Sequence, residues 1–398
     1  QPVQQVNPPG FELPAIDLSR CGVQQHGPLR IEVVDPVDDY LELMQQLFDF
    51  ERMVAWMAAG NRVVFDAFHG ITGPYAERIL GGLLGAAPAD LHNTNPLPDF
   101  GGLHPDPNPV DGHHLVELCS GPQAPALAAA SDGDGDRNMI LGPGCLVSPG
   151  DSVAMLLDGA RLVPGYRQGL PGVARSMPTS RALDEVAAAL GIPCYETPTG
   201  WRFFCNLLEA GRIGLCGEES YGTGSSHARE KDGLWAVLFW INLLAVRGQS
   251  LPQLVAAHWQ RYGRHYFQRR DYMIEDAAAA GRLVEALRGQ LAGLAGSTLG
   301  GARVELADDF AYHDSVDGST SAHQGIRLVR DDGSRIVYRL SGTGTSGATL
   351  RVYLEQCHRD AARLQLDPSQ VLAPLGTLAA EFAQIEHHTG LARPTMTV

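Results

Sequence analysis

Lysine is almost absent from this sequence. Of the 30 basic side chains in 398 residues, 29 are arginine and one is Lys231, against 45 acidic residues and a formal net charge of -15. This shortage of positive charge excludes a nucleic-acid-binding surface, which needs a basic stripe. A lone lysine is either a chance surface residue or a compact point charge kept for a purpose that arginine cannot serve.

Paired cysteines and long apolar runs are also missing. The seven cysteines include no Cys-x-x-Cys pair, a pattern typical of reduced thiols in a cytosolic protein and not of a disulfide framework or a zinc site. The longest apolar run, residues 234–246, is interrupted by Asn242 and is too short to span a bilayer, so it predicts a buried core helix. No secretory signal precedes the first motif. We therefore expect a cytoplasmic protein with neither membrane nor nucleic acid as a partner.

The chain is long enough for two or three domains, at about 150 residues each. Alternating strand and helix patterns predict α/β units, and the strand-then-helix pattern after residue 264 predicts a smaller α+β unit. The Gln/Pro-rich start has little periodicity and is expected to be irregular. The expected boundaries are 1–29 (irregular), 30–147 (α/β), 148–263 (α/β) and 264–398 (α+β).

An acidic loop, residues 131–138, follows a short apolar strand. Its glycines allow a tight backbone, so that Asp132, Asp134 and Asp136 can converge. Three adjacent carboxylates repel one another unless a cation lies between them, and oxygen ligands favour Mg²⁺ or Ca²⁺. Arg137 and Pro143 occupy positions where an EF-hand needs Gly and Glu, so Mg²⁺ is favoured over Ca²⁺. The alternative is a solvated acidic turn.

A polar loop, residues 217–233, contains the only lysine and leads into the predicted core helix. Side chains such as Glu218 and Ser220 suit the vicinal hydroxyl groups of a sugar. His227, Arg229 and Lys231 would supply positive charge for a phosphate. The alternative is a mobile surface loop.

A hydroxyl-rich loop, residues 339–347, lies between two predicted strands, and Arg351 follows it. Backbone N–H groups and hydroxyls in a Gly-rich turn form a site for anions, and two flanking arginines can hold phosphate oxygens. The loop has no Walker A lysine, and by itself it can equally be a simple turn. His113–His114 and His387–His388 have no carboxylate or cysteine partner at metal-ligand spacing and are interpreted as surface residues.

Taken in order, the three loops resemble those of the α-D-phosphohexomutases, and more narrowly the eukaryotic-type phosphoglucomutases. The resemblance covers residues 30–398 and rests on long stretches: SDGDGDRNMILG, ARSMPTSRALDEVA, YETPTGWRFF, LCGEESYGTGSSHAREKDGLWAVL, VDGSTSAHQGIRL and SRIVYRLSGTGTSGATLRVY. It implies an α/β fold with tandem three-layer α/β/α domains plus a C-terminal α+β domain.

The resemblance also implies roles for individual residues. Mg²⁺ would be bound by Asp132, Asp134 and Asp136, with Arg137 beside them as a catalytic residue. The sugar would contact Thr199, Gly200, Glu218 and Ser220, with Arg229 and Lys231 nearby. The non-reacting phosphate would be held by Arg339, Ser341, Gly342, Thr343 and Arg351.

The implied reaction interconverts glucose 1-phosphate and glucose 6-phosphate through glucose 1,6-bisphosphate and a phosphoserine of the first family domain, in a monomeric enzyme. Lys231 is our candidate for proton transfer, on the hypothesis that neighbouring cations lower its pKa. The serine loop of the family, of the type Thr-Ala-Ser-His-Asn-Pro, does not occur here, and residues 92–96 are only superficially similar because they contain no serine. We therefore expect the first family domain to be absent. A non-catalytic phosphosugar-binding or scaffold relative stays open as the alternative.

Overall fold

The computed structural model describes residues 16–342 and 347–398, which form parts of two compact units, Gln1–Gln46 and Leu47–Val398. In the first unit β1 (Gly22–His26) pairs antiparallel with β2 (Leu29–Val33), and α1 (Pro36–Leu47) follows. The expectation of an irregular segment up to residue 29 is therefore wrong for its last eight residues. Gly27, at a φ of 60°, begins the two-residue turn that a hairpin needs.

The second unit begins with a five-stranded sheet in the order β4-β3-β5-β6-β7. The strands β4, β3 and β5 are parallel, whereas β6 and β7 are antiparallel to their neighbours. Because β3 and β5 are wholly buried and parallel, their carboxyl ends deliver polar residues to one edge. The strands are β3 (Val63–Asp66), β4 (Leu91–His92), β5 (Leu127–Ser131), β6 (Asn138–Gly142) and β7 (Cys145–Val147), with helices α2 (Phe50–Ala58), α3 (Gly73–Ala76), η1 (Glu77–Leu83), η2 (Pro88–Asp90), η3 (Phe100–Gly102) and α4 (His113–Ser120).

A four-stranded sheet follows in the order β11-β10-β8-β9. The strands β8, β9 and β10 are parallel, so the polar loops after each of them emerge at the same edge. The strands are β8 (Val173–Ser176), β9 (Cys194–Thr197), β10 (Leu215–Gly217) and β11 (Thr223–Ser225), with helices α5 (Pro149–Gly159), η4 (Ala160–Leu162), η5 (Pro164–Tyr166), α6 (Ala182–Leu190), α7 (Trp201–Glu209), α8 (Gly233–Arg247) and α9 (Leu251–Tyr262).

The helix α8 is apolar on all sides because it is enclosed on all sides. Its residues from Gly233 to Leu244 are all buried, and it contacts β5 and β6 of the first sheet as well as β11 of the second. Asp232 caps its start by accepting a hydrogen bond from the Trp235 backbone N–H at 2.9 Å. Within the described residues no single helix is long and apolar enough to cross a membrane; α8 and α9 together meet the length and composition criteria but are bent by 86°.

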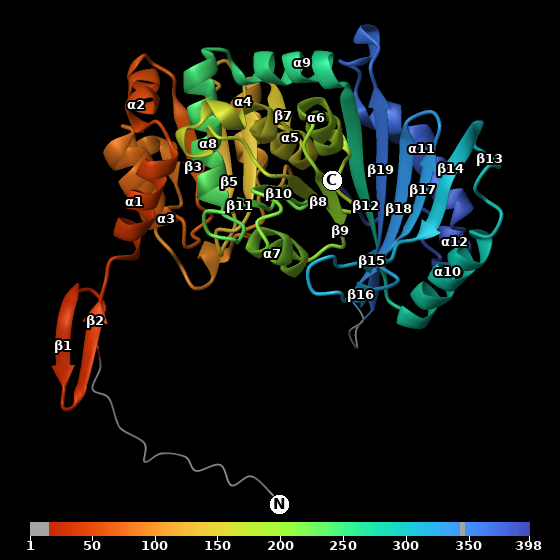
Figure 1. The fold of residues 1–398 in the computed structure, drawn as a ribbon, viewed down its shortest axis with the longest axis horizontal. Helices are drawn as coiled ribbons and strands as arrows, with labels where there is room; N and C mark the ends of the chain where they lie inside the picture. Colours follow the sequence, from red (N-terminus) through yellow and green to blue (C-terminus); the bar gives the residue numbers. More distant parts are fainter. Residues whose placement is uncertain (1–15, 343–346) are drawn as a thin grey trace, which may run out of the picture. The chain divides into compact units, whose positions relative to one another are not determined.

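The third sheet is antiparallel throughout, with seven strands in the order β13-β14-β17-β18-β19-β12-β20. Helices α10, α11 and α12 pack on one face and enclose its apolar core (Figure 1). The strands are β12 (Arg264–Ile274), β13 (Thr298–Leu299), β14 (Ala302–Asp309), β17 (Ile326–Arg330), β18 (Ser334–Ser341), β19 (Ala348–His358) and β20 (Met396–Thr397), with a separate pair β15 (Tyr312–His313) and β16 (Thr320–Ser321), and helices α10 (Ala277–Gln290), η6 (Ala361–Arg363), α11 (Pro368–Phe382) and α12 (Ile385–Thr389).

Two helical segments of the second unit are irregular. The helix α3 starts at Gly73 and continues as η1, a π-helix in which the Leu84 N–H bonds to the Ile79 carbonyl at 3.0 Å. The last helical segment is divided into α11 and α12. Asp367 caps the start of α11 ahead of Pro368, so Pro374 lies inside this helix. Gln384, at a φ of 47°, separates α11 from α12.

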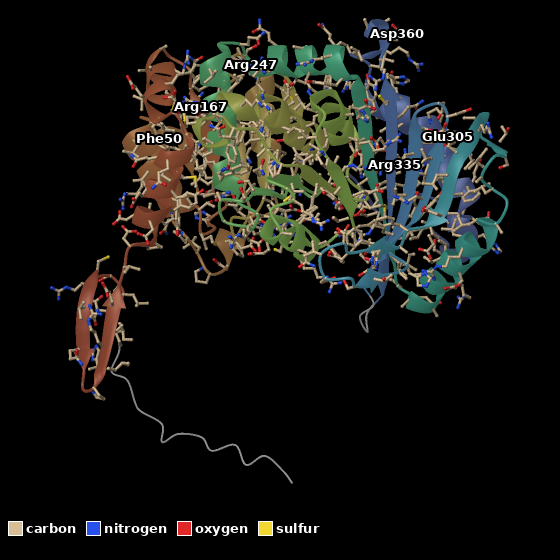
Figure 2. All side chains as sticks on the ribbon, viewed as in Figure 1. Phe50, Arg167, Arg247, Glu305, Arg335 and Asp360 are labelled. Atoms are coloured by element: carbon tan, nitrogen blue, oxygen red, sulfur yellow. The ribbon has the colours of Figure 1, made fainter. Side chains whose placement is uncertain are left out.

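A buried ionic network joins the second and third sheets. Arg335 of β18 (Figure 2) donates to the backbone carbonyls of Met177 and Thr179 at 2.7 and 2.6 Å and pairs with Glu355 at 2.8 Å. Glu355 also accepts a hydrogen bond from His265 at 2.7 Å. Burial disfavours the imidazolium, but hydrogen bonds to Cys357 and Glu355 outweigh burial and raise the pKa of His265 to about 10. These contacts fix the large antiparallel sheet against the loop after β8.

Candidate active site

The acidic loop brings its three aspartates together, as the spacing predicts. A ligand oxygen from each of Asp132, Asp134 and Asp136 lies within 4.8 Å of the others. Asp132 is buried, and Arg137 donates to it twice, from its backbone N–H at 2.9 Å and from Nε at 2.5 Å. Three carboxylates grouped in this way can hold a divalent cation.

The charges in the acidic loop are unevenly distributed. Burial disfavours the Asp132 carboxylate, but Arg137 outweighs this effect and lowers its pKa. Burial raises the pKa of Asp136 to about 6, even though Lys231 bonds to it, and burial together with Asp132 raises the pKa of Asp134. The loop therefore carries excess negative charge that a cation would neutralise.

The polar loop is joined to the acidic loop through the backbone. Arg137 and Gly222 form an isolated antiparallel bridge, and the Asn138 N–H donates to the Tyr221 carbonyl at 3.0 Å. Gly233 donates to the Gly135 carbonyl at 2.9 Å, and a Cβ at Gly233 would lie 2.3 Å from the Arg137 carbonyl oxygen. Two loops more than 80 residues apart in sequence thus form one surface.

The expected sugar-contacting residues lie around Glu218. Glu218 is buried and accepts a hydrogen bond from the Gly200 N–H at 3.3 Å, which brings the ends of β9 and β10 together. Burial and the adjacent Glu219 raise the pKa of Glu218 to about 7. The buried Thr199 Oγ1 has no hydrogen-bond partner among the described residues, and Ser220 is half-buried. These polar groups suit a polyhydroxylated ligand.

Lys231 lies beside the aspartates, with its Nζ 2.5 Å from Asp136 Oδ2. The hypothesis that its pKa is lowered is wrong. Burial does disfavour the ammonium, but Asp136, Glu218 and Asp132 surround it, and together they raise its pKa. The only lysine of the chain is a stable positive charge in the midst of carboxylates.

The other two basic residues of the polar loop, Arg229 and His227, bond to partners outside the acidic loop. Arg229 is exposed and pairs with Glu209 of α7 at 3.0 Å. The His227 side chain is buried, stacks on Trp235, and bonds to Ser225 and Asp232 at 2.7 and 3.0 Å. The expectation that His227 supplies charge to a phosphate is therefore wrong, because its ring is enclosed and both ring nitrogens already have partners, Ser225 in β11 and Asp232 at the start of α8.

The hydroxyl-rich loop ends in two neighbouring arginines. Arg339 of β18 and Arg351 of β19 are directly opposite in the antiparallel register, and Arg351 is opposite Asp271 of β12. Like charges directly opposite one another are unfavourable unless an anion or acid neutralises them. Ser341 is half-buried at the end of β18, Gly342 is exposed with a φ of 76°, and Thr343 lies outside the described residues.

Three further residues of the site, Glu219, Tyr353 and Asp106, were not predicted from the sequence. Glu219 accepts hydrogen bonds from Ser176 at 2.9 Å and from the hydroxyl of Tyr353 at 3.0 Å. Arg339 donates to the same hydroxyl at 3.3 Å, so Tyr353 links the polar loop to the arginine pair. Asp106, from the long loop before α4, holds Arg137 at 2.6 Å. Only the doubled glutamate at 218–219 offered a clue in the sequence.

One histidine interpretation was also wrong. His114 was taken as a surface residue without a carboxylate partner, but its Nε2 lies 2.7 Å from Asp66 Oδ2. The partner is 48 residues earlier in the chain, at the end of β3, and no local spacing indicates it.

Comparison with known proteins identifies the family of this chain. Residues 38–144 and 149–262 match the family models "Phosphoglucomutase/phosphomannomutase, alpha/beta/alpha domain II" and "domain III", and residues 264–395 match "Phosphoglucomutase-1, C-terminal domain". A phosphoglucomutase of Rhizobium radiobacter is 52% identical over 381 residues, which cover 96% of this chain and 70% of that protein. The chain belongs to the phosphoglucomutase family.

Other phosphoglucomutases agree with this assignment and with the expected fold class. Human phosphoglucomutase-1 is 46% identical, with 96% of this chain and 70% of that protein covered. The crystal structure of the Paramecium phosphoglucomutase parafusin superposes with a TM-score of 0.89 at 44% identity over 96% of this chain and 69% of that one. The chain spans only 64% of the length of the chloroplastic phosphoglucomutase of Arabidopsis thaliana.

Proposed function

We propose that this phosphoglucomutase-family chain binds hexose phosphates for the interconversion of glucose 1-phosphate and glucose 6-phosphate through glucose 1,6-bisphosphate. The observation that carries the proposal is the backbone junction between the acidic and polar loops, which places the Asp136 carboxylate and the Lys231 ammonium 2.5 Å apart. Through Glu219, Tyr353 and Arg339 the same polar loop reaches the arginine pair. A ligand with a sugar ring and two phosphates matches this order of groups.

The aspartates fit Mg²⁺. Asp132, Asp134 and Asp136 offer only carboxylate oxygens within 4.8 Å of one another, which is the hard donor set that this ion prefers. When bound, Mg²⁺ would neutralise negative charge on a transferring phosphoryl group. Arg137 is assigned a catalytic place beside it, because it already neutralises Asp132 and is itself positioned by Asp106.

The protein's own side chains would hold the rest of the ligand. Arg339 and Arg351 provide two guanidinium groups for the non-reacting phosphate, together with Ser341, Gly342 and Thr343. Glu218, Ser220, Thr199 and the Gly200 backbone line the sugar position, and Glu218 has a pKa near 7, so it can either donate to or accept from a hydroxyl group. Lys231 supplies fixed positive charge, and Arg229 is an exposed cation of the same loop.

The phosphoryl acceptor distinguishes the proposed function from its alternative. The serine loop expected for the family does not occur in them. The alternative function, phosphosugar binding without turnover, is favoured by that single observation. Location in the cytoplasm and a monomeric state complete the proposal.

Calorimetric titration of glucose 1,6-bisphosphate in the presence of Mg²⁺ tests the binding site. We expect saturable binding that weakens at least tenfold in Arg351→Gln, because one of two facing guanidinium groups is lost, and that is unchanged in the exposed control Arg303→Gln. Equal affinity in both variants contradicts the assigned phosphate site. A coupled assay with glucose 1-phosphate then separates the two functions: conversion supports the mutase, and binding without conversion supports the alternative.

A further inference from the structure

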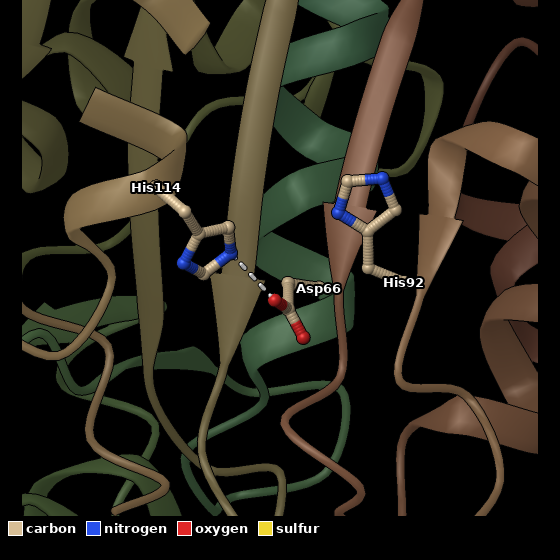
Figure 3. A group of neighbouring side chains, drawn as sticks. All are labelled: Asp66, His92 and His114. Carbon is tan, nitrogen blue, oxygen red and sulfur yellow. Dashed lines mark hydrogen bonds and ion pairs between the residues drawn. The ribbon is translucent and has the colours of Figure 1, made fainter. Parts of the chain in front are cut away.

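A second group of metal-ligand side chains lies at the end of the parallel strands, apart from the three aspartates. Asp66 ends β3, His92 ends β4 directly beside it in the parallel register, and His114 lies in the first turn of α4. One ligand atom from each lies within 4.8 Å of the other two, and Figure 3 shows the three side chains around a common space.

The hydrogen bonds around Asp66 favour its charged carboxylate form, which is the form that binds a metal ion. Its side chain is fully buried, and burial alone would raise its pKa; hydrogen bonds from His114, Phe68 and Asn93 outweigh this effect and lower the pKa. Oδ1 accepts from the Phe68 N–H at 2.8 Å and from Asn93 Nδ2 at 2.9 Å, so the carboxylate is held in place. Oδ2 faces His114 at 2.7 Å.

The two imidazoles are also oriented. His92 Nε2 lies 3.2 Å from the Ala89 carbonyl, and a proton on Nε2 leaves a lone pair on Nδ1. In Figure 3 the other ring nitrogen of His92 is on the side that faces Asp66 and His114. A hydrogen bond from the far nitrogen to a backbone carbonyl is the usual arrangement behind a metal-ligating histidine. The His114 ring packs edge-on against Phe68 and its side chain is 39% exposed, which provides a route for an ion.

We propose that Asp66, His92 and His114 form a binding site for a divalent transition-metal ion of the zinc type, distinct from the aspartate cluster. Two imidazoles and one carboxylate suit Zn²⁺ or Co²⁺ and do not suit Mg²⁺, which prefers oxygen ligands. The ion takes the place of the hydrogen bond between His114 and Asp66. Neutral His114 then carries its single proton on Nδ1, a tautomer change through solvent that needs no other reactant.

The segment that follows Asp66 is in direct contact with the acidic loop. After Asp66 the chain turns through Phe68 and His69, both with positive φ, and the Ile71 N–H donates to the Gly133 carbonyl at 3.0 Å. A Cβ at Gly70 would lie 2.7 Å from the Asp132 carbonyl oxygen, so the two loops are in direct backbone contact. An ion at Asp66 therefore stabilises the segment on which the acidic loop rests.

The test uses the 398-residue chain, stripped of metal and titrated with Co²⁺ while excess Mg²⁺ occupies oxygen-ligand sites. We expect one Co²⁺ to bind with visible absorption typical of nitrogen and oxygen ligands, and to be displaced by Zn²⁺. His92→Asn and His114→Asn each weaken this binding at least tenfold. The matched control is His113→Asn, because His113 is the exposed neighbour of His114 and is not part of the cluster.

A thermal shift provides the second readout. Zn²⁺ raises the melting temperature of the wild type and of His113→Asn by preferential binding to the folded state, and raises it less in His92→Asn and His114→Asn. Equal Co²⁺ affinity in the wild type and both cluster variants overturns the proposal. So does Co²⁺ binding that is lost in Asp134→Asn but kept in His114→Asn, since that pattern assigns the ion to the aspartates.

Discussion

At the scale of single residues, the structure shows which side chains of the site are charged and which have shifted pKa values. Lys231 stands out in the sequence because it is the only lysine, and its position beside Asp136 agrees with a role in the site. Its chemistry is the opposite of the one we expected, because the groups around it are carboxylates and raise its pKa. Glu218, in the same loop, has a pKa of about 7.

Replacing Lys231 by Gln should strengthen Mg²⁺ binding roughly tenfold, about 1.4 kcal/mol. The ammonium competes with a cation for Asp136, and one unit charge at this range is worth more than 1 kcal/mol in a protein environment. Calorimetric titration of Mg²⁺ measures the effect, with Lys231→Arg, which keeps the charge, expected to resemble the wild type. Equal Mg²⁺ affinity of the Lys231→Gln and Lys231→Arg variants would contradict the competition between the ammonium and the cation.

Glu218→Gln should make folding less sensitive to pH. The pKa of Glu218 is about 7 in the folded protein and its ordinary value is 4.5, so the folded state binds the proton more tightly. The wild type is therefore stabilised by this proton below pH 4.5 and loses up to about 3 kcal/mol as the pH rises to 7 and above. Gln resembles the protonated carboxyl at every pH.

Urea denaturation between pH 5 and pH 8.5 measures this difference. The stability of Glu218→Gln relative to the wild type should increase with pH over that interval. The control Glu381→Gln changes an exposed glutamate of α11 and should give a constant difference. A flat difference for Glu218→Gln as well would mean that Glu218 is charged throughout.

At the scale of elements, the site depends on close backbone contacts between loops and one helix. The helix α8 begins at Gly233, where the N–H donates to Gly135 of the acidic loop at 2.9 Å. No side chain fits there, because a Cβ would lie 2.3 Å from the Arg137 carbonyl oxygen. The first turn of α8 thus fixes the spacing between the acidic loop and the polar loop.

Gly233→Ala should therefore destabilise the protein by about 1–3 kcal/mol and weaken Mg²⁺ binding. The same substitution at Gly281, inside α10, meets no atom within 4 Å and should be neutral or add up to about 1 kcal/mol of stability. Denaturation curves and Mg²⁺ titrations of both variants compare them directly. Equal behaviour of the two would show that the contact at Gly233 relaxes without cost.

At the scale of the whole second unit, buried ion pairs decide how the antiparallel sheet is attached. Arg335 is 2% exposed and serves two backbone carbonyls of the loop after β8 as well as Glu355. Glu355 in turn holds His265 and the backbone N–H of Arg181. The arginine pair at residues 339 and 351 lies on two strands of this sheet, so its place relative to Glu218 depends on the network.

Arg335→Met should lower the free energy of unfolding by about 3–5 kcal/mol, because Glu355 keeps a buried charge without its main partner. The exposed control Arg303→Met should change it by less than about 0.5 kcal/mol. Chemical denaturation followed by tryptophan fluorescence measures both. A loss below 1 kcal/mol for Arg335→Met would contradict the claim that the Arg335–Glu355 network stabilises the folded protein.

By itself, the sequence determined the local patterns of the fold and the chemistry of each loop. Alternation of strands and helices, the Asp-Gly repeat and the apolar run of α8 are readable because they depend on neighbours in the chain. The phosphoglucomutase family was also recognisable from the three loops in order, and the comparisons confirm it.

Only the tertiary structure decided which distant residues share a site. The pairs Asp66 with His114, Asp106 with Arg137 and Tyr353 with Glu219 are separated by 48, 31 and 134 residues, and no local period links them. The pKa of Lys231 was misjudged for the same reason. The sign of a pKa shift depends on which charges the fold places within a few ångströms, and that information exists only after the strands have been paired and the loops brought together.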